Sequence, residues 1–172
     1  MTDPTSTSQA DCCEPTCCDG GAATTSTVTA GAAEVRQTVR DGYGRIARGE
    51  QSSCCGPTSA CCGGDDADQL ARAVGYDAEE LEALPEGANL GLSCGNPTAL
   101  ARLKPGEVVL DLGAGAGFDI FVAAGRVGAE GRAIGVDMTP DMVERARSNV
   151  AAHRERTGLD NVEFRLGEIE NL

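Results

Sequence analysis

Hydrophobic residues in the second half of the chain alternate between the spacing of strands and the spacing of helices. Short apolar runs at 108–112, 132–137 and 162–166 predict three strands. Helical spacing at about 117–127 and from Pro140 to about Thr157 predicts a helix after each of the first two strands. The order β-α-β-α-β is expected for the first half of a doubly wound, Rossmann-like parallel sheet.

The first half of the chain predicts shorter helices and a cysteine-rich loop. The expected helices cover residues 34–48, about 66–74, 78–84 and 97–103, and the loop covers 49–64. Residues 1–33 are rich in Ser, Thr, Gly, Ala and Asp, so we expect a disordered, cysteine-containing tail. We therefore divide the chain into a tail at 1–33, a helical region at 34–103 and a Rossmann-like domain at 104–172.

The turn after the first predicted strand carries glycines at every second position. Gly113, Gly115 and Gly117 let a ligand approach the backbone closely, and Asp137 ends the next strand with a carboxylate able to bind ribose hydroxyls. The spacing is G-x-G-x-G, whereas the dinucleotide fingerprint is G-x-G-x-x-G. Asp111 would repel a pyrophosphate but attract the ammonium of a methionine moiety. The pattern therefore favours S-adenosylmethionine over NAD, and a glycine turn without a ligand is a weaker interpretation.

Composition excludes several classes of partner. The formal net charge of −13 argues against nucleic acid and anionic membranes, which both need basic patches. No apolar run approaches the roughly 20 residues that span a bilayer, and the first residues do not resemble a signal peptide. We therefore expect a cytoplasmic monomer whose nine cysteines are thiols or ligands rather than a disulfide framework.

Eight of the nine cysteines occur as adjacent pairs, at 12–13, 17–18, 54–55 and 61–62. Paired thiols suit soft ions such as Zn(II), Cu(I) or As(III), although the spacing is not that of a zinc knuckle. We expect Cys54, Cys55, Cys61 and Cys62 to bind or deliver a metalloid, whereas the 12–18 group is as easily incidental. Cys94 stands alone in a glycine-containing loop before the first strand, where a thiolate could hold a substrate near the cofactor. The alternative is a small buried thiol that packs this loop.

Taken together, these segments resemble bacterial arsenite S-adenosylmethionine methyltransferases. The resemblance covers about residues 34–172 and is most specific in two motifs. These motifs are Ser93-Cys94-Gly95-Asn96-Pro97 before the glycine turn and Val136-Asp137-Met138-Thr139-Pro140 after it. Further matching segments are Leu110–Gly113, Gly117-Phe118-Asp119 and Leu166-Gly167-Glu168-Ile169-Glu170.

The resemblance implies transfer of a methyl group from S-adenosylmethionine to thiolate-bound As(III), as in arsenic detoxification. The arsenic lone pair attacks the methyl carbon, so no general base is required, and we expect His153 to be a solvated surface residue. The resemblance makes Cys94 an arsenic ligand and catalytic residue. It places Asp111 and Gly113 to Gly117 beside the methionine moiety, Asp137 and Met138 beside the ribose and adenine, and Glu168 and Ile169 beside the adenine. The implied partners are arsenite or its thiol conjugates and a small-thiol or thioredoxin-type reductant.

Family members of full length supply further arsenic-binding cysteines from later segments. We therefore expect this chain to correspond to an N-terminal portion with an incomplete sheet, and to methylate arsenite poorly by itself. Two other functions remain open: a cysteine-rich protein that sequesters arsenic or a soft metal on a vestigial methyltransferase fold, and a methyltransferase of a small organic molecule.

Overall fold

The computed structural model describes residues 31–50, 67–92 and 95–171. Three parallel strands form its sheet in the order β1-β2-β3, with β1 at Val108–Leu112, β2 at Arg132–Asp137 and β3 at Val162–Leu166. Val109 pairs with Ala133, and Ala133 pairs with Val162. The parallel sheet with helical crossovers confirms the Rossmann-like fold class predicted from the alternating periods.

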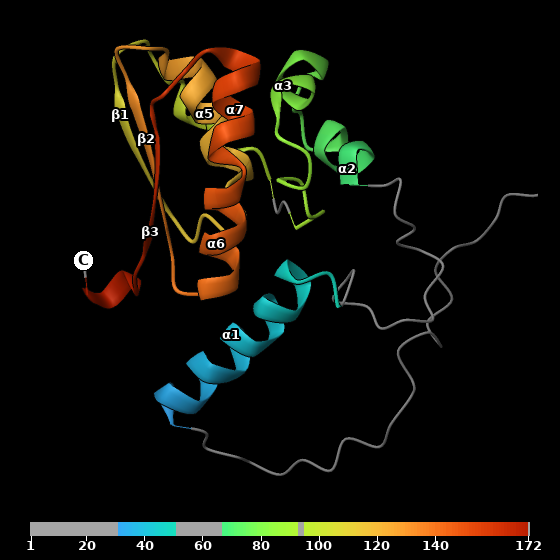
Figure 1. The fold of residues 1–172 in the computed structure, drawn as a ribbon, viewed down its shortest axis with the longest axis vertical. Coiled ribbons are helices and arrows are strands. Elements are labelled where there is room, and N and C mark those ends of the chain that lie inside the picture. The colour runs from blue at the N-terminus through green and yellow to red at the C-terminus, as the bar shows by residue number, and fades with distance from the viewer. Residues whose placement is uncertain (1–30, 51–66, 93–94, 172) are drawn as a thin grey trace, which may run out of the picture.

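The crossover helices cover one face of the sheet (Figure 1). Helix α5 spans Phe118–Val127, and the next crossover consists of α6 at Pro140–Ser148 and α7 at Val150–Thr157. The sequence predicted one continuous helix there, but a break occurs at Asn149. The core lies between these helices and the sheet, and includes Ile120, Ala124, Ala133, Val143 and Phe164.

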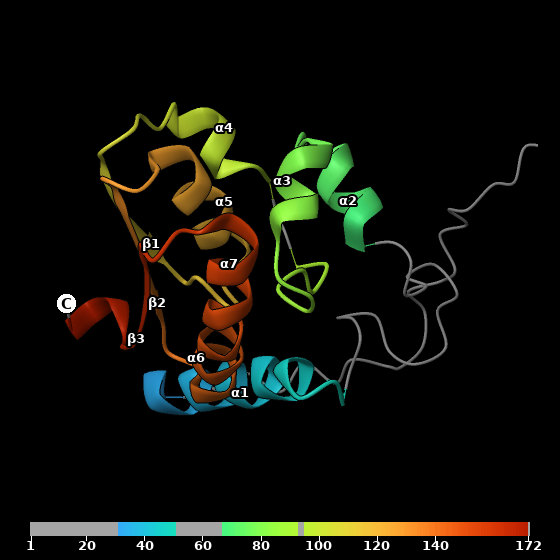
Figure 2. The same ribbon diagram turned by 45° about the horizontal axis from the view of Figure 1, so that its top comes forward.

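The opposite face of β1 is exposed. Val108, Leu110 and Leu112 point away from the helices and are 70%, 56% and 43% exposed, whereas the intervening Val109 packs against the core. This alternation follows from the two-residue period of a strand. Among the described residues no helix lies on this face (Figures 1 and 2), which fits the expectation that part of the sheet is uncovered.

Within the described ranges, four helices precede the sheet. Helix α1 spans Ala32–Ala47, α2 spans Ala67–Ala73, α3 spans Ala78–Ala83 and α4 spans Pro97–Ala101. Their bounds agree with the predicted helices to within a few residues. Helix α3 packs against α5 and α7, while α1 packs against α6 and lies beyond the carboxyl ends of the strands (Figures 1 and 2). A short 3-10 helix, Ile169–Asn171, follows β3 near α1.

His153 is buried, and the prediction of a solvated surface residue is wrong. Its side chain is 1% exposed, and its ring lies 5.1 Å from that of Phe121. Burial lowers the pKa of its imidazole. Helix α7 is only weakly amphipathic in sequence, so its buried side could not be read from the apolar spacing.

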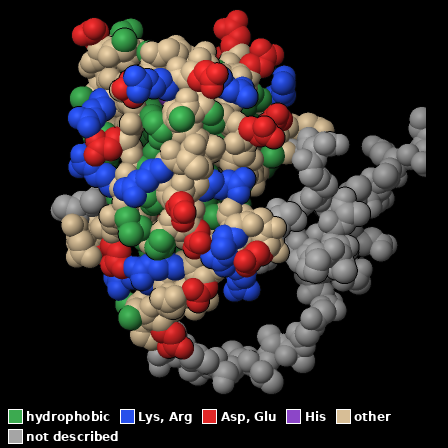
Figure 3. Space-filling view, in the orientation of Figure 1, with side chains coloured by type: hydrophobic (Ala, Val, Ile, Leu, Met, Phe, Trp, Pro, Cys, Tyr) green, Lys and Arg blue, Asp and Glu red, His purple; other side chains and the backbone are tan. Residues whose placement is uncertain are grey.

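No described helix is long and apolar enough to cross a bilayer. Figure 3 shows acidic and basic side chains interspersed on one face of the described part, so neither sign forms a continuous field there. The predicted division into tail, helical region and Rossmann-like domain stays a prediction, and the tail lies outside the described residues except for 31–33.

Candidate cofactor-binding site

The glycine turn joins β1 to α5 and has the backbone conformation that its sequence predicts. Gly113, Gly115 and Gly117 have φ values of 92°, 52° and 90°, in the left-handed region that favours glycine. The backbone N–H groups of Gly113 and Ala114 donate to the carbonyl of Val136 at 2.8 Å and 3.0 Å. The turn is thereby tied to the carboxyl end of the neighbouring strand, β2.

Asp137 is held by two backbone hydrogen bonds. Its Oδ2 accepts from the N–H of Gly115 at 2.9 Å, and its Oδ1 accepts from the N–H of Thr139 at 2.7 Å. A carboxylate oxygen has more than one lone pair, so both oxygens can accept a further hydrogen bond. Asp137 is therefore fixed in place and still able to bind ribose hydroxyls.

A cavity of about 980 Å³ opens beside the turn. Of the cofactor-binding residues expected from sequence, it is lined by Gly113, Gly115, Asp137, Met138 and Ile169. A Cβ atom placed on Gly113 or Gly115 would meet no other atom within 4 Å. The space beside these two glycines is therefore open to a ligand. The glycine turn, the strand-ending carboxylate and this space fit the nucleoside part of S-adenosylmethionine.

Gly117 serves the packing of the turn. A Cβ on this residue would lie 2.5 Å from Cζ of Phe164 and 3.1 Å from Cε2 of Phe121, and Gly117 is not among the described residues that line the cavity. Glycine is needed here because the aromatic core approaches the turn. A cofactor role for Gly117 stays a prediction.

Asp111 is a partly buried carboxyl group near the end of β1. Burial, followed by the charges of Asp119 and Asp137, raises its pKa to about 6. Among the described residues, Asp111, Asp119 and Asp137 form no ion pair. Asp111 is not among the described residues that line the cavity. Its predicted place beside the ammonium of the methionine moiety stays a prediction.

Glu168 has a protein partner in this structure. Its carboxylate forms an ion pair with Arg40 of α1, and it lines a neighbouring cavity of about 820 Å³. Ile169 lines the larger cavity instead. The predicted contact of Ile169 with adenine is compatible with this placement, and that of Glu168 stays a prediction.

The structure brings residues to the cavity that sequence analysis gave no cofactor role. Asn96 and Asp119 line it, as do Arg36, Val39 and Tyr43 of α1. Asn96 and Asp119 lie in segments that resemble arsenite methyltransferases, and this resemblance could have identified them as site residues. The contribution of α1 had no such signal, because it depends on a contact between segments more than 60 residues apart.

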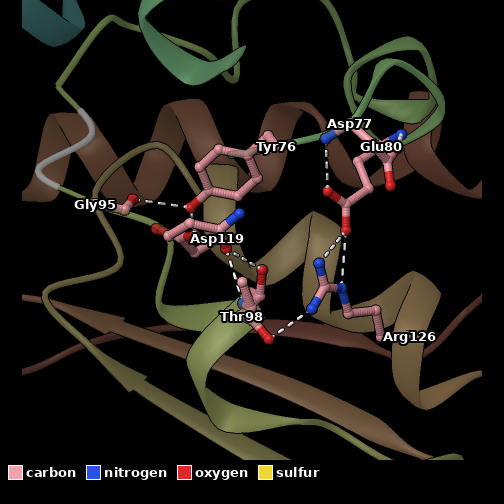
Figure 4. A network of polar contacts seen from close by, with 9 residues as sticks. Tyr76, Asp77, Glu80, Gly95, Thr98, Asp119 and Arg126 are labelled. Atoms are coloured by element: carbon pink, nitrogen blue, oxygen red, sulfur yellow. Dashed lines mark hydrogen bonds and ion pairs between the residues drawn. The ribbon is translucent and has the colours of Figure 1, made fainter. Parts of the chain in front are cut away.

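Tyr76 connects the chain before β1 to this site. Its hydroxyl lies within hydrogen-bonding distance of Asp119, to which it donates, and 3.2 Å from the carbonyl of Gly95 (Figure 4). Its ring makes an edge contact with Phe118 at 4.7 Å. Arg126 of α5 similarly binds Glu80 and the carbonyl of Thr98, so α3 and α4 are both fastened to α5.

The cysteine predictions are not tested by this structure. Cys94, Cys54, Cys55, Cys61 and Cys62 lie outside the described residues, as do the pairs at 12–13 and 17–18. Within the described ranges, no three His, Cys, Asp or Glu side chains are grouped to hold a metal ion. Leu92 and Gly95, which flank residues 93–94, both line the large cavity.

The parallel sheet, the glycine turn and Asp137 define the class as S-adenosylmethionine-dependent methyltransferases, and a family model described as a methyltransferase domain matches residues 103–172. The chain is 48% identical to an arsenite methyltransferase of Halobacterium salinarum over 81% of its length. It is 36% identical to an arsenite methyltransferase of Aquipseudomonas alcaligenes over 80% of its length. The chain is thus a homologue of arsenite methyltransferases, and the resemblance proposed from sequence is confirmed.

The match covers only part of each relative's length. The chain spans 36% of the Halobacterium salinarum protein and 37% of the Aquipseudomonas alcaligenes protein. A solved arsenic(III) S-adenosylmethionine methyltransferase from Chlamydomonas reinhardtii is 38% identical, with a TM-score of 0.41 over 59% of this chain and 32% of that chain.

Proposed function

We propose that this chain binds S-adenosylmethionine and takes part in methyl transfer to thiolate-bound As(III). The proposal rests chiefly on the cavity, which is bordered both by the glycine turn and by the chain on either side of residues 93–94. A cofactor in the turn and an acceptor held at Cys94 would therefore share one space. Homology to proteins named arsenite methyltransferases supplies the identity of the acceptor.

The residues of the chain have separable tasks in this proposal. Gly113 and Gly115 leave space for the cofactor, Asp137 orients its ribose, and Asp111 favours its ammonium group. When bound, S-adenosylmethionine supplies an electrophilic methyl carbon on its sulfonium. Because the lone pair of As(III) carries no proton, the site needs no general base. Catalysis would come from positioning and from exclusion of water.

The proposed partners follow from the same chemistry. Arsenite or its thiol conjugates would be the acceptor, and a small thiol or a thioredoxin-type protein would be the reductant. We also propose a cytoplasmic location, where we expect the cysteines to be thiols or ligands. The lack of nucleic-acid or membrane partners remains an expectation from the net charge, and monomeric behaviour is a separate expectation.

A binding and activity experiment tests this function. The chain and its Cys94→Ser variant are titrated with S-adenosylhomocysteine and with arsenite, and then incubated with arsenite, glutathione and methyl-labelled cofactor. We expect both forms to bind S-adenosylhomocysteine, and only the unmodified chain to form methylarsenic, at a low rate.

Two results would replace the proposal. Arsenite binding that is unaffected by Cys94→Ser, without any cofactor binding, would identify a sequestering protein. Methylation of small organic acceptors that is unchanged in the variant, without any methylarsenic product, would identify a small-molecule methyltransferase.

A further inference from the structure

The carbonyl of Gly95 accepts a hydrogen bond from the hydroxyl of Tyr76 at 3.2 Å. Gly95 is the first described residue after 93–94, and it lines the large cavity. Consecutive Cα atoms lie about 3.8 Å apart across a trans peptide, so covalent geometry ties Cys94 closely to Gly95. The Tyr76 contact therefore acts one residue away from the thiol to which the proposed function assigns arsenic.

Tyr76 itself is fixed by the two residues that follow the glycine turn. Its ring makes an edge contact with Phe118 at 4.7 Å, and its hydroxyl is bonded to the carboxyl group of Asp119 (Figure 4). Phe118 and Asp119 lie in the first turn of α5, directly after Gly117. Tyr76 is buried, so its ring cannot turn away into solvent. One side chain thus connects the glycine turn with Gly95.

The Tyr76 hydroxyl has one proton and faces two acceptors, the carbonyl of Gly95 and the carboxyl group of Asp119. Burial, and then the hydrogen bond with Asp119, raise the pKa of the phenol, so this proton stays in place at ordinary pH. A charged carboxylate is a stronger acceptor than a carbonyl, so Asp119 draws the proton away from Gly95. Loss of that charge should strengthen the bond to Gly95, which gives this contact a testable signature.

The chain after Gly95 is held by separate contacts. Asn96 caps α4 with its side-chain oxygen, and the carbonyl of Thr98 accepts from the guanidinium of Arg126 on α5 at 2.6 Å. These contacts fasten α4 without the help of Tyr76. Removal of the Tyr76 hydroxyl should therefore release the chain at Gly95 while α4 stays in place.

We propose that Tyr76 is a positioning residue for methyl transfer, because its hydroxyl holds Gly95 against α5 and so sets the distance between Cys94 and the glycine turn. This inference rests on the proposed function, in which Cys94 holds the acceptor. In-line attack on the methyl carbon depends on the separation of the reacting atoms. Tyr76 is not among the described residues that line the cavity, so it acts through Gly95.

Hydrogen exchange tests the contact itself. Tyr76→Phe removes the hydroxyl and keeps the ring that contacts Phe118. We expect severalfold faster exchange in the peptide that contains residues 93–97, measured by mass spectrometry. Tyr43→Phe is the matched control: it makes the same chemical change at the other tyrosine, which is 47% exposed on α1, and should leave the exchange of residues 93–97 unchanged.

Asp119→Asn separates the hydrogen bond from general packing. An amide oxygen accepts less strongly than a carboxylate, and an amide nitrogen can donate to the phenol oxygen. Either orientation of the amide leaves more of the Tyr76 proton to Gly95. We expect the exchange of residues 93–97 to equal that of the unmodified chain or to be slower. A purely structural role of this polar cluster would instead make exchange faster in both variants.

Single-turnover methyl transfer tests the consequence for the reaction. The chain, in excess over methyl-labelled S-adenosylmethionine, is incubated with arsenite and glutathione, and labelled methylarsenic is measured over time. We expect Tyr76→Phe to lower the rate constant about 10- to 100-fold, because a misplacement of about 1 Å can cost that much. The affinity for S-adenosylhomocysteine, measured by calorimetric titration, should stay unchanged.

The outcomes distinguish this inference from the proposed function. Unchanged exchange in Tyr76→Phe, faster exchange with an unchanged rate constant, or parallel losses of rate and S-adenosylhomocysteine affinity would each overturn the positioning role. Absence of methylarsenic from the unmodified chain would overturn the proposed function and any role of Tyr76 in it, while exchange would still show whether Tyr76 holds Gly95. Faster exchange and a selective loss of rate in Tyr76→Phe, with exchange not faster in Asp119→Asn, support the positioning role.

Discussion

Asp137 and Gly115 are joined by a hydrogen bond of 2.9 Å from the backbone N–H of Gly115 to Oδ2 of Asp137, across 22 residues of sequence. The bond ties the middle of the glycine turn to the end of the neighbouring strand. The same carboxylate thus shapes the turn and faces the cavity that the turn borders. Ligand binding and local backbone order should consequently depend on this one side chain.

Replacing Asp137 with Ala removes two hydrogen bonds to the backbone and the proposed acceptors for the ribose. Since a hydrogen bond to a charged group contributes about 1.5–3 kcal/mol, we expect affinity for S-adenosylhomocysteine to fall at least about 10-fold. Calorimetric titration measures the change, with Glu155→Gln, an exposed position on α7, as the control. An affinity equal to that of the unmodified chain would remove Asp137 from the site.

Gly117→Ala should destabilise the fold more than Gly113→Ala. Both residues have positive φ, which costs an alanine about 1–2 kcal/mol. Only at Gly117 would the added Cβ also meet Phe164, at 2.5 Å, and such overpacking costs roughly 1–3 kcal/mol more. Urea denaturation gives the free energy of unfolding of each variant. Equal losses would show that Phe164 moves aside freely.

His153 should weaken the fold in acid. Burial lowers its pKa in the folded state, so the unfolded chain binds the proton more readily. Its contribution is complete above the ordinary pKa of about 6.5 and is lost as pH falls below that value. We expect His153→Leu to reduce the fall in unfolding free energy between pH 7 and pH 5. Identical pH slopes for the two proteins would contradict this expectation.

Asp111 should make cofactor binding depend on pH. Its pKa of about 6 means that the carboxyl group is charged at pH 8 and mostly neutral at pH 5. Attraction for an ammonium group requires the charged form, so affinity for S-adenosylhomocysteine should decrease below about pH 6. Asp111→Asn should bind more weakly at pH 8 and show a smaller decrease.

The same raised pKa of Asp111 stabilises the fold in acid, and that contribution is lost as pH rises through about 6.

The ion pair between Arg40 and Glu168 should hold α1 over the cavity. The two side chains are 29% and 27% exposed, and partly exposed pairs contribute up to about 1 kcal/mol. We expect Arg40→Glu to lower the hydrogen-exchange protection of α1 and the double variant Arg40→Glu with Glu168→Arg to restore it. Lower protection that persists in the double variant would assign the effect to packing rather than charge.

Several parts of the fold and site were predictable because their signals are local. The three strands follow from short apolar runs, and α5 follows from the helical spacing of its apolar residues. The glycine turn follows from residues that tolerate positive φ. Motif spacing identified Asp137. Each of the two specific motifs, at 93–97 and 136–140, contributes residues that line the cavity. The break at Asn149 and the burial of His153 were missed. The apolar and polar residues of α7 do not separate clearly onto two sides of the helix, and its neighbours come from distant segments.

The sequence by itself determined the order of strands and helices, the identity of the glycine turn and the relationship to arsenite methyltransferases, since these depend on residue type and spacing. Only the tertiary structure decided that Glu168 pairs with Arg40, that α1 lines the cavity, and that Asn96 and Asp119 line it too. These arrangements arise when parallel strands bring their carboxyl ends to one edge and separate helices pack around it. No local pattern records which distant side chains will meet there.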